Sequence, residues 1–255
     1  MVGLFDEPYQ TDLEGADKEV EKKENLEVAL QSSKESLVLL KNERNTLPLD
    51  ISSIKKIAVC GPNADESGYA LTHYGPLAVD VVTVLQGIKD KVKGKAEVLY
   101  AKGCELVDDN WPESELIDYP LTETEKDEID KAVADVKQAD VAVVVLGGGQ
   151  RTCGENKSRS SLDLPGRQLD LLKAVYATGK PVVLVSINWA DKFVPAILEA
   201  WYPGSMGGIA VADALFGDYN PGGKLTVTFP KSVGQIPLNF PAKPSSQIDG
   251  GKNPG

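Results

Sequence analysis

Residues Ala139-Asp-Val-Ala-Val-Val-Val-Leu146 lead into a loop, Gly147–Gln168, and then into Gln168-Leu-Asp-Leu-Leu-Lys-Ala-Val-Tyr176. The first run is short, apolar and rich in β-branched residues, which is typical of a buried strand. The last run has apolar residues at helical spacing, and Pro165 suits the first turn of a helix, where a missing N–H is not needed. Together the three pieces predict a strand, a loop and a helix.

The loop between this strand and this helix contains the candidate chemistry. Ligands of open α/β sheets bind at the carboxyl edge of the strands, and the glycines of this loop allow close approach to its backbone. Glu155 is the only acid in the glycine-rich half, and Arg151, Lys157 and Arg159 flank it. Desolvation raises a carboxyl pKa and guanidinium groups lower it, so such a group serves as acid or base. From spacing alone, a structural salt bridge is the commoner role for a loop glutamate.

Composition excludes several classes of function. The net charge of −11 argues against nucleic acid or an anionic membrane as a partner, because either requires a basic face. No apolar run reaches the roughly 18–20 residues of a membrane span. The first residues also lack a secretory signal pattern. A periplasmic or secreted location nevertheless stays open for the parent protein. With one histidine and three scattered cysteines, we expect no metal. The loop lacks both phosphate-binding glycine frames, so we expect no nucleotide and no cofactor.

Strand and helix patterns alternate along the chain. Thr122 and Glu125 have the spacing of a capping box at the start of one helix. We expect helices at 18–34, 81–92, 123–137, 168–177 and 207–216, and strands at 37–40, 54–60, 96–101, 139–146, 181–187, 196–201 and 224–229. This alternation predicts a three-layer α/β sandwich, a mostly parallel sheet with helices on both faces. The fold alone carries no function.

Motifs along almost the whole chain are similar to those of one enzyme family. They include Ser36-Leu-Val-Leu-Leu-Lys-Asn42, Ile57-Ala-Val-Cys-Gly-Pro-Asn-Ala-Asp65, Gly154-Glu-Asn-Lys-Ser-Arg159 with Leu162-Asp-Leu-Pro-Gly-Arg-Gln168, and Ala200-Trp-Tyr-Pro-Gly204 leading to Leu215-Phe-Gly-Asp-Tyr-Asn-Pro-Gly-Gly-Lys-Leu225. In this order they resemble the C-terminal α/β-sandwich domain of glycoside hydrolase family 3, the β-glucosidase and β-xylosidase family.

The resemblance implies a reaction and roles for residues. In that family a (β/α)8 barrel supplies an aspartate nucleophile, and the sandwich domain offers a glutamate acid/base from a Gly-Glu-x-x-x-Arg loop. This implies that Glu155 is the acid/base, that Arg159 orients it and binds substrate, and that the parent is a retaining, exo-acting β-glycosidase. The two carboxyl groups of such a site lie roughly 5–5.5 Å apart. The implied partners are a β-glycoside or oligosaccharide and the barrel domain.

Departures from the family pattern shape the expected domain organisation. The nucleophile motif (Ser-Asp-Trp or similar) is missing, and Gly3-Leu-Phe-Asp-Glu-Pro-Tyr9 resembles the segment that leaves the barrel. We therefore expect a connector at 1–15, a sandwich domain at 16–255 that is truncated at its C-terminus, and no activity from the chain alone. Ser186-Ile-Asn-Trp-Ala-Asp191 stands where the family carries an Asn-Gly-Arg-Pro-Leu turn, as if several residues were lost.

Other polar and aromatic residues are weaker candidates. His73 could hydrogen-bond sugar hydroxyls, although a structural loop histidine is the commoner case. Trp111, Trp189 and Trp201 could stack on sugar rings, but Trp201 falls in an expected strand and fits the core better.

Two functions from different classes remain open. In one, Glu155 serves catalysis in a β-glycosidase; in the other, the chain is a non-catalytic module that binds a sugar or a partner domain, and Glu155 is structural. A solvent-facing Glu155 at the carboxyl edge of the sheet, without a saturating salt bridge, favours catalysis. A Glu155 locked against Arg151 or Arg159 favours the binding module.

Overall fold

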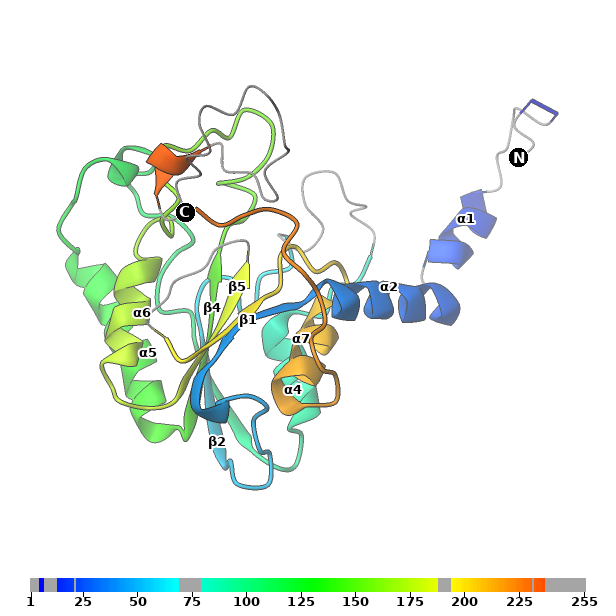
Figure 1. Ribbon diagram of the computed structural model, residues 1–255, viewed down its shortest axis with the longest axis horizontal. Coiled ribbons are helices and arrows are strands. Elements are labelled where there is room, and N and C mark those ends of the chain that lie inside the picture. Colours follow the sequence, from blue (N-terminus) through cyan, green and yellow to red (C-terminus); the bar gives the residue numbers. More distant parts are fainter. Residues whose placement is uncertain are drawn as a thin grey trace, which may run out of the picture.

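The computed structural model describes residues 5–6, 13–20, 22–68, 79–187, 194–230 and 232–236. A six-stranded sheet lies at its centre, with helices on both faces (Figure 1). The strands are β1 (Val38–Asn42), β2 (Lys56–Cys60), β3 (Glu97–Ala101), β4 (Val141–Gly147), β5 (Val182–Ile187) and β6 (Ala196–Glu199). The helices are α1 (Leu13–Val20), α2 (Lys23–Ser36), α4 (Val84–Lys91), α5 (Glu123–Gln138), α6 (Gln168–Tyr176) and α7 (Gly207–Phe216), with 3-10 turns η1 (Glu43–Asn45), η2 (Glu113–Glu115) and η3 (Val233–Gln235). The predicted three-layer α/β sandwich is confirmed.

The order of the strands identifies the position at which a ligand site is expected. The sheet runs β1-β6-β5-β4-β2-β3, and all neighbours are parallel except β1, which pairs antiparallel with β6. The chain steps outward from β2 to β3 and then returns to β4 on the other side of β2. The loops that follow β2 and β4 therefore leave in opposite directions, and this switch point at the carboxyl edge is where open α/β sheets bind ligands.

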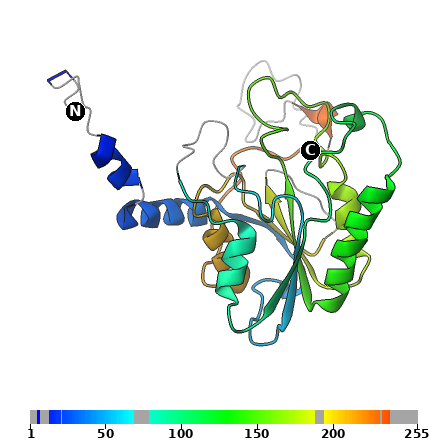
Figure 2. The ribbon, with the colours of Figure 1, turned by 180° about the vertical axis from the view of Figure 1, so that it is seen from behind.

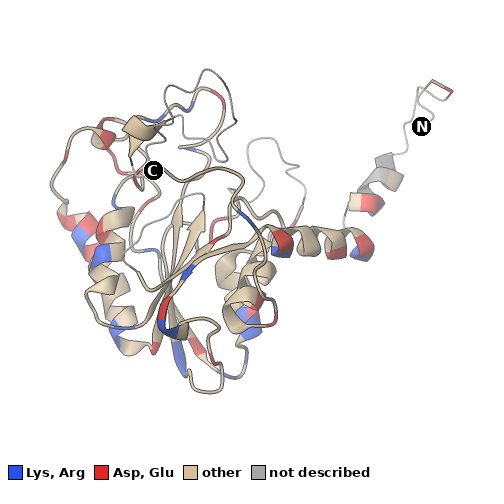
Figure 3. Ribbon diagram, viewed as in Figure 1, with Lys and Arg blue, Asp and Glu red and all other residues tan. Residues whose placement is uncertain are grey.

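The alternation of side chains along the strands builds two cores. In β4, Val141, Val143 and Val145 contribute to the core shared with α4 and α7, whereas Ala142 and Val144 contribute to the core shared with α5 and α6. The two helix pairs lie on opposite faces of the sheet (Figures 1 and 2). The sequences of β4 and β5 contain no charged residue, and Figure 3 shows charges concentrated on the outer helices and loops. Such strands are buried on both faces.

Helices α4 and α7 touch through their backbones. A Cβ atom added to Gly208 would lie 2.0 Å from the carbonyl oxygen of Thr83, and one added to Gly87 would lie 2.1 Å from that of Gly208. Any side chain at either position would push the helices apart. Glycine at these two positions therefore permits the close packing of this layer.

The amino edge of the sheet is tied together by polar contacts. The Asp140 carboxylate, just before β4, accepts hydrogen bonds from the backbone N–H groups of Lys55 (2.8 Å) and Lys56 (2.9 Å) at the start of β2. Lys180, before β5, donates its Nζ to the carbonyl oxygen of Ala139 at 2.7 Å. These contacts fix the starts of three central strands.

Most predicted elements are present within a few residues of their expected ends. The Thr122–Glu125 capping box is confirmed: Thr122 Oγ1 accepts the Glu125 N–H, and the Glu125 side chain accepts the Thr122 N–H. The helix expected over 18–34 is instead two helices, α1 and α2. No helix within the described parts combines the length and apolar content needed to cross a bilayer.

Three further sequence predictions are wrong. Residues 224–229 form no strand, and Leu225 and Val227 are exposed because the segment joins no ladder. Strand β6 ends at Glu199, so Trp201 lies beyond it, half-buried, with a φ of 57°. Pro165 precedes helix α6 instead of opening it, because Gly166 adopts a φ of 59° that interrupts the helix there.

Candidate functional site

One buried side chain pins both ends of the loop between β4 and α6. Gln168, the first residue of α6, is fully buried and accepts the N–H of Gly147 at 2.8 Å through its amide oxygen. Its amide nitrogen donates to the carbonyl oxygens of Gly147 (3.0 Å) and Leu106 (2.8 Å). All the polar atoms of this buried amide are engaged, so the last residue of the strand and the first residue of the helix are held together.

The first part of the loop is fixed against the carboxyl edge of the sheet. The N–H of Gly148 bonds to the carbonyl oxygen of Ile187 in β5 (2.9 Å), and Asn63, from the loop after β2, donates its side-chain amide to the Gly148 carbonyl (2.9 Å). Thr152 is buried and its hydroxyl accepts the N–H of Gly149 at 3.0 Å. The loop therefore starts from a rigid platform at the switch point between β2 and β4.

Beyond Thr152 the loop turns outward and presents Glu155. Residues 153–158 are all exposed, and the N–H of Lys157 bonds to the carbonyl oxygen of Gly154 at 3.2 Å. Gly154 and Asn156 have φ values of 134° and 60°, so the residues on both sides of Glu155 adopt backbone conformations that reverse the chain. Among the described residues, no ion pair or hydrogen bond engages the Glu155 carboxylate.

Arg159, which was expected to orient Glu155, lies against other groups. Its Nε donates to Oε1 of Glu115 at 2.6 Å, and its Nη2 donates to the carbonyl oxygen of Asp163 at 2.6 Å. Its guanidinium also lies over the ring of Trp111, 5.5 Å from the ring centroid. The structure thus brings Arg159 together with the loop between β3 and α5.

Glu115 is a residue of this site that sequence reasoning missed. It ends η2, and burial alone would raise its pKa, but hydrogen bonds from Ser160 and Arg159 outweigh that effect and lower the pKa below its usual value. Its partners lie 44 and 45 residues away, so nothing in the local sequence marks the contact. Only a signal from pairs of positions changing together among relatives could have found it.

A second ion pair anchors the far end of the same loop. Arg167 is buried and donates its Nε to Oε1 of Glu125 at 2.9 Å. Its Nη1 and Nη2 donate to the carbonyl oxygens of Tyr119 (2.9 Å) and Pro120 (3.3 Å). Burial alone would raise the pKa of Glu125, but hydrogen bonds from Thr122 and Arg167 lower it overall. The loop carrying Glu155 is therefore tied to the start of α5.

The remaining sequence candidates are dispersed. His73 and Trp189 lie outside the described residues. Trp111 is half-buried beneath Arg159, and Trp201 donates its Nε1 to the carbonyl oxygen of Ser36 at 3.1 Å. No group of three acidic, histidine or cysteine side chains in the described parts of the chain is placed to hold a metal ion.

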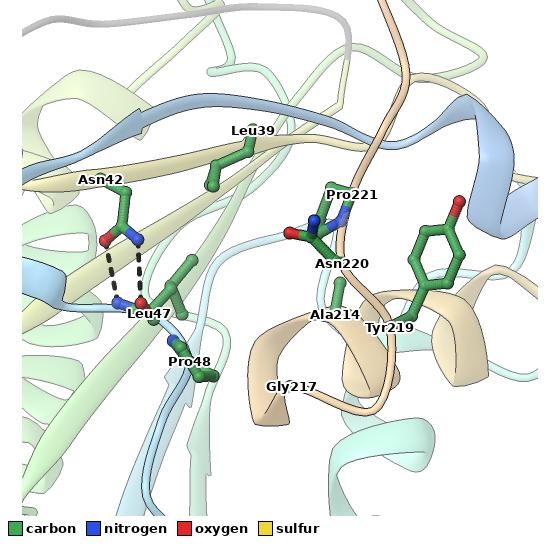
Figure 4. A pocket seen from close by; sticks show the side chains of 9 residues that line it. All are labelled: Leu39, Asn42, Leu47, Pro48, Ala214, Gly217, Tyr219, Asn220 and Pro221. Atoms are coloured by element: carbon green, nitrogen blue, oxygen red, sulfur yellow. Dashed lines mark hydrogen bonds between the residues drawn. The ribbon is translucent and has the colours of Figure 1, made fainter.

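A separate hollow of about 250 Å³ lies between β1, the outermost strand of the sheet, and the C-terminal end of α7 (Figure 4). Asn42 and Leu47 close one side of it through two hydrogen bonds, from Leu47 N–H to Asn42 Oδ1 (2.9 Å) and from Asn42 Nδ2 to the Leu47 carbonyl (2.8 Å). The lining comes from β1, the turn after it, and the end of α7 with the residues that follow it: Leu39, Asn42, Leu47, Pro48, Ala214, Gly217, Tyr219, Asn220 and Pro221. None of these is a carboxylic acid, so the hollow offers no acid/base pair.

Comparison with known proteins assigns most of the chain, including the loop that carries Glu155, to one family. The family model described as "Glycosyl hydrolase family 3 C-terminal domain" matches residues 37–253. The chain belongs to this family. The match includes β1 to β6 and the whole loop that carries Glu155.

The relatives of this glycoside hydrolase family 3 domain are longer proteins. A β-xylosidase from Formosa agariphila is 40% identical over 257 aligned positions, which cover 95% of this chain and 33% of that protein. A periplasmic β-glucosidase from Salmonella typhimurium is also 40% identical, over 94% of this chain and 33% of that protein. The chain therefore spans about a third of the length of these curated relatives.

Solved structures give the same result for the fold. A β-glucosidase from Listeria innocua, solved in complex with isofagomine, superposes with a TM-score of 0.75 at 32% identity, covering 93% of this chain and 32% of that one. A β-glucosidase from Erythrobacter marinus superposes with a TM-score of 0.75 at 35% identity, covering 92% of this chain and 34% of that one.

Proposed function

We propose that this domain supplies the acid/base carboxyl group, Glu155, to the active site of a retaining, exo-acting β-glycosidase. One observation carries the proposal. Glu155 is exposed on a turn that leaves the switch point of the sheet, and it has no partner among the described residues, because Arg159 forms its ion pair with Glu115 instead. Within the described parts of the chain, Glu155 forms no ion pair with Arg151 or Arg159, the contact that would favour the non-catalytic module.

The chemistry requires two carboxyl groups with different tasks. A carboxylate nucleophile attacks the anomeric carbon while Glu155 gives its proton to the departing glycosidic oxygen. In the second half of the reaction the Glu155 carboxylate takes a proton from water, which attacks the anomeric carbon and releases the sugar with retained configuration. A group that alternates between acid and base must not be locked to a permanent cation, which fits the surroundings of Glu155.

The nucleophile is expected from a (β/α)8 barrel, as the family resemblance implies. A short exposed turn above a fixed platform suits a group that reaches into a neighbouring domain, because the platform limits the positions that its tip can take. The names of the relatives, β-xylosidase and β-glucosidase, support terminal β-linked xylose or glucose as the sugar that is released. Taken alone, the chain is expected to be inactive, since it supplies one carboxyl group of the pair.

The test compares the chain alone with the chain joined to a barrel. In the joined form, this chain replaces the corresponding part of the Salmonella β-glucosidase, and hydrolysis of nitrophenyl β-glucoside and β-xyloside is measured. We expect no turnover by the chain alone, turnover by the joined protein, and its loss in Glu155→Gln. Glu113→Gln is the matched control, because Glu113 is an exposed acid on the neighbouring loop. Steady turnover by the chain alone, or a Glu155→Gln variant as active as the control, would refute the proposal.

A further inference from the structure

We propose that Glu115 is a positioning residue for Glu155, acting through Arg159 and Ser160. The proposal rests on the proposed function, because the position of Glu155 matters only if its carboxyl group takes part in a reaction. Glu115 ends η2 in the loop between β3 and α5, and its side chain is only 5% exposed. Glu125 also bonds to this loop, but it does so through Arg167 at the far end, twelve residues after Glu155, whereas Glu115 bonds four and five residues after it.

Both carboxylate oxygens of Glu115 bond to consecutive residues of the Glu155 loop. Oε1 accepts the Nε–H of Arg159 at 2.6 Å. Oε2 accepts both the backbone N–H and the hydroxyl of Ser160, each at 2.7 Å. Hydrogen bonds to an ionised carboxylate are stronger than neutral ones. The bond to the backbone of Ser160 matters most, because it fixes the main chain itself as well as a side chain.

These bonds form the second of two anchors around the exposed tip. The first anchor is Thr152, three residues before Glu155, whose buried hydroxyl bonds to Gly149. The second is Ser160, five residues after Glu155. Residues 153–158 between them are all exposed. Without the second anchor, the tip would be held closely on one side only.

The other contacts of Arg159 do not replace this anchor. Its bond to the carbonyl oxygen of Asp163 stays within the same loop, and its stacking on Trp111 is a contact of a side chain, which leaves the Ser160 backbone free to move. Glu115 is thus the acceptor that connects the main chain of the tip to a different loop. Because a misplacement of about 1 Å costs a reacting group roughly 10²-fold in rate, this connection bears on catalysis.

The substitution that tests the anchor is Glu115→Gln. It keeps the size of the side chain but replaces one acceptor oxygen with an N–H donor, which then faces either the Nε–H of Arg159 or the N–H of Ser160. Glu113→Gln, two residues earlier on the same 3-10 turn, is the matched control. Ser160→Ala removes the hydroxyl bond and keeps the backbone bond, so it is expected to give an intermediate effect.

The first measurement is amide hydrogen exchange on the 255-residue chain. We expect amides in 153–160 to exchange about tenfold faster in Glu115→Gln than in Glu113→Gln, as for the loss of one charge-assisted hydrogen bond. Because the lost bonds also stabilise the folded chain, the melting temperature of Glu115→Gln should fall by about 2–4 °C, and amides of β4 and α6 should be accelerated no more than those of 153–160. Equal exchange of 153–160 in the two variants would overturn the proposal.

The second measurement uses the joined enzyme and two substrates. A poor alkyl leaving group needs protonation by the general acid, whereas a dinitrophenyl group leaves without it. We expect kcat/KM in Glu115→Gln to fall at least about tenfold for an alkyl β-glucoside and to change little for the dinitrophenyl β-glucoside. A merely structural role would slow both substrates equally, and that result would overturn the proposal.

The two proposals fail differently. If Glu155→Gln hydrolyses the alkyl glucoside as well as the control does, the proposed function is wrong. If Glu155→Gln is slow but Glu115→Gln behaves like Glu113→Gln on both substrates, only the positioning role is wrong.

Discussion

The two edges of the sheet are built in opposite ways. At the amino edge, the charged groups of Asp140 and Lys180 bond to backbone groups at the starts of neighbouring strands. At the carboxyl edge, the loop between β4 and α6 is long. Its described ion pairs, those of Arg159 and Arg167, lie in the part of the loop that follows Glu155. There, Glu115 and Glu125 pair with two of the three arginines of the loop, Arg159 and Arg167, and Glu155 faces solvent.

This difference shows which charged groups serve stability and which are available for chemistry. A carboxylate that accepts two backbone N–H groups, such as Asp140, is held ionised by its bonds and is of no use for moving protons. An exposed carboxylate on an anchored turn adds little to stability, but it can approach a substrate. Substitutions at the two edges should therefore affect different quantities.

The largest effect is expected from Glu155→Gln at the carboxyl edge. In the joined enzyme, kcat/KM for an alkyl β-glucoside should fall about 10²–10⁴-fold, because the proton donor to the leaving oxygen is lost. The melting temperature of the chain should stay unchanged, since the side chain is exposed and has no described partner. Steady-state kinetics of the joined enzyme test the first statement, and calorimetry of the chain tests the second. A large fall in melting temperature would show that Glu155 is structural.

The next effect concerns the packing between the edges. Gly208→Ala should destabilise the chain by about 1–3 kcal/mol, because its Cβ would overlap the Thr83 carbonyl oxygen and force α4 and α7 apart. Gly222→Ala is the control, since no atom lies within 4 Å of a Cβ added there. Urea unfolding of both variants measures the difference. Equal stability of the two would mean that the helices are packed less closely than described.

A smaller effect is expected from Asp140→Ala at the amino edge. The change removes the acceptor shared by the Lys55 and Lys56 N–H groups, and the melting temperature should fall by about 2–4 °C. Catalysis by the joined enzyme should be unaffected, because the residue lies at the other end of β4 from Glu155. Asp130→Ala, an exposed acid on α5, is the control and should leave the melting temperature nearly unchanged.

The smallest effect is the pH dependence of that same contact. Hydrogen bonds from the backbone of Lys56 and Lys55 lower the pKa of Asp140 below its ordinary value of 3.8. The stabilisation is therefore complete above pH 3.8 and is lost as the pH falls through the lower, folded-state pKa. We expect the stability difference between the parent chain and Asp140→Ala to be constant at neutral pH and to shrink in this acidic window. A difference that grows on acidification would contradict this sign.

The sequence was sufficient for the elements whose pattern is local. The run of valines in β4, the capping box at Thr122 and the helical spacing after Gln168 all depend on residues close in the chain, and each was predicted correctly. Residues 224–229 alternate like a strand but pair with none, since a ladder depends on distant partners. In the same way, the sequence pointed to Glu155, but the pairing of Arg159 with Glu115 depends on a fold that brings two loops together.

Anion rescue of Glu155→Ala in the joined enzyme tests the central claim most directly. With a dinitrophenyl β-glucoside the first step needs no acid, but water attacks slowly without a base, so the sugar stays on the nucleophile. Azide attacks without help from a base, and we expect it to accelerate turnover and to give a β-glucosyl azide. No acceleration and no azide product, with hydrolysis as fast as in Glu113→Ala, would contradict the assignment of Glu155 as the acid/base.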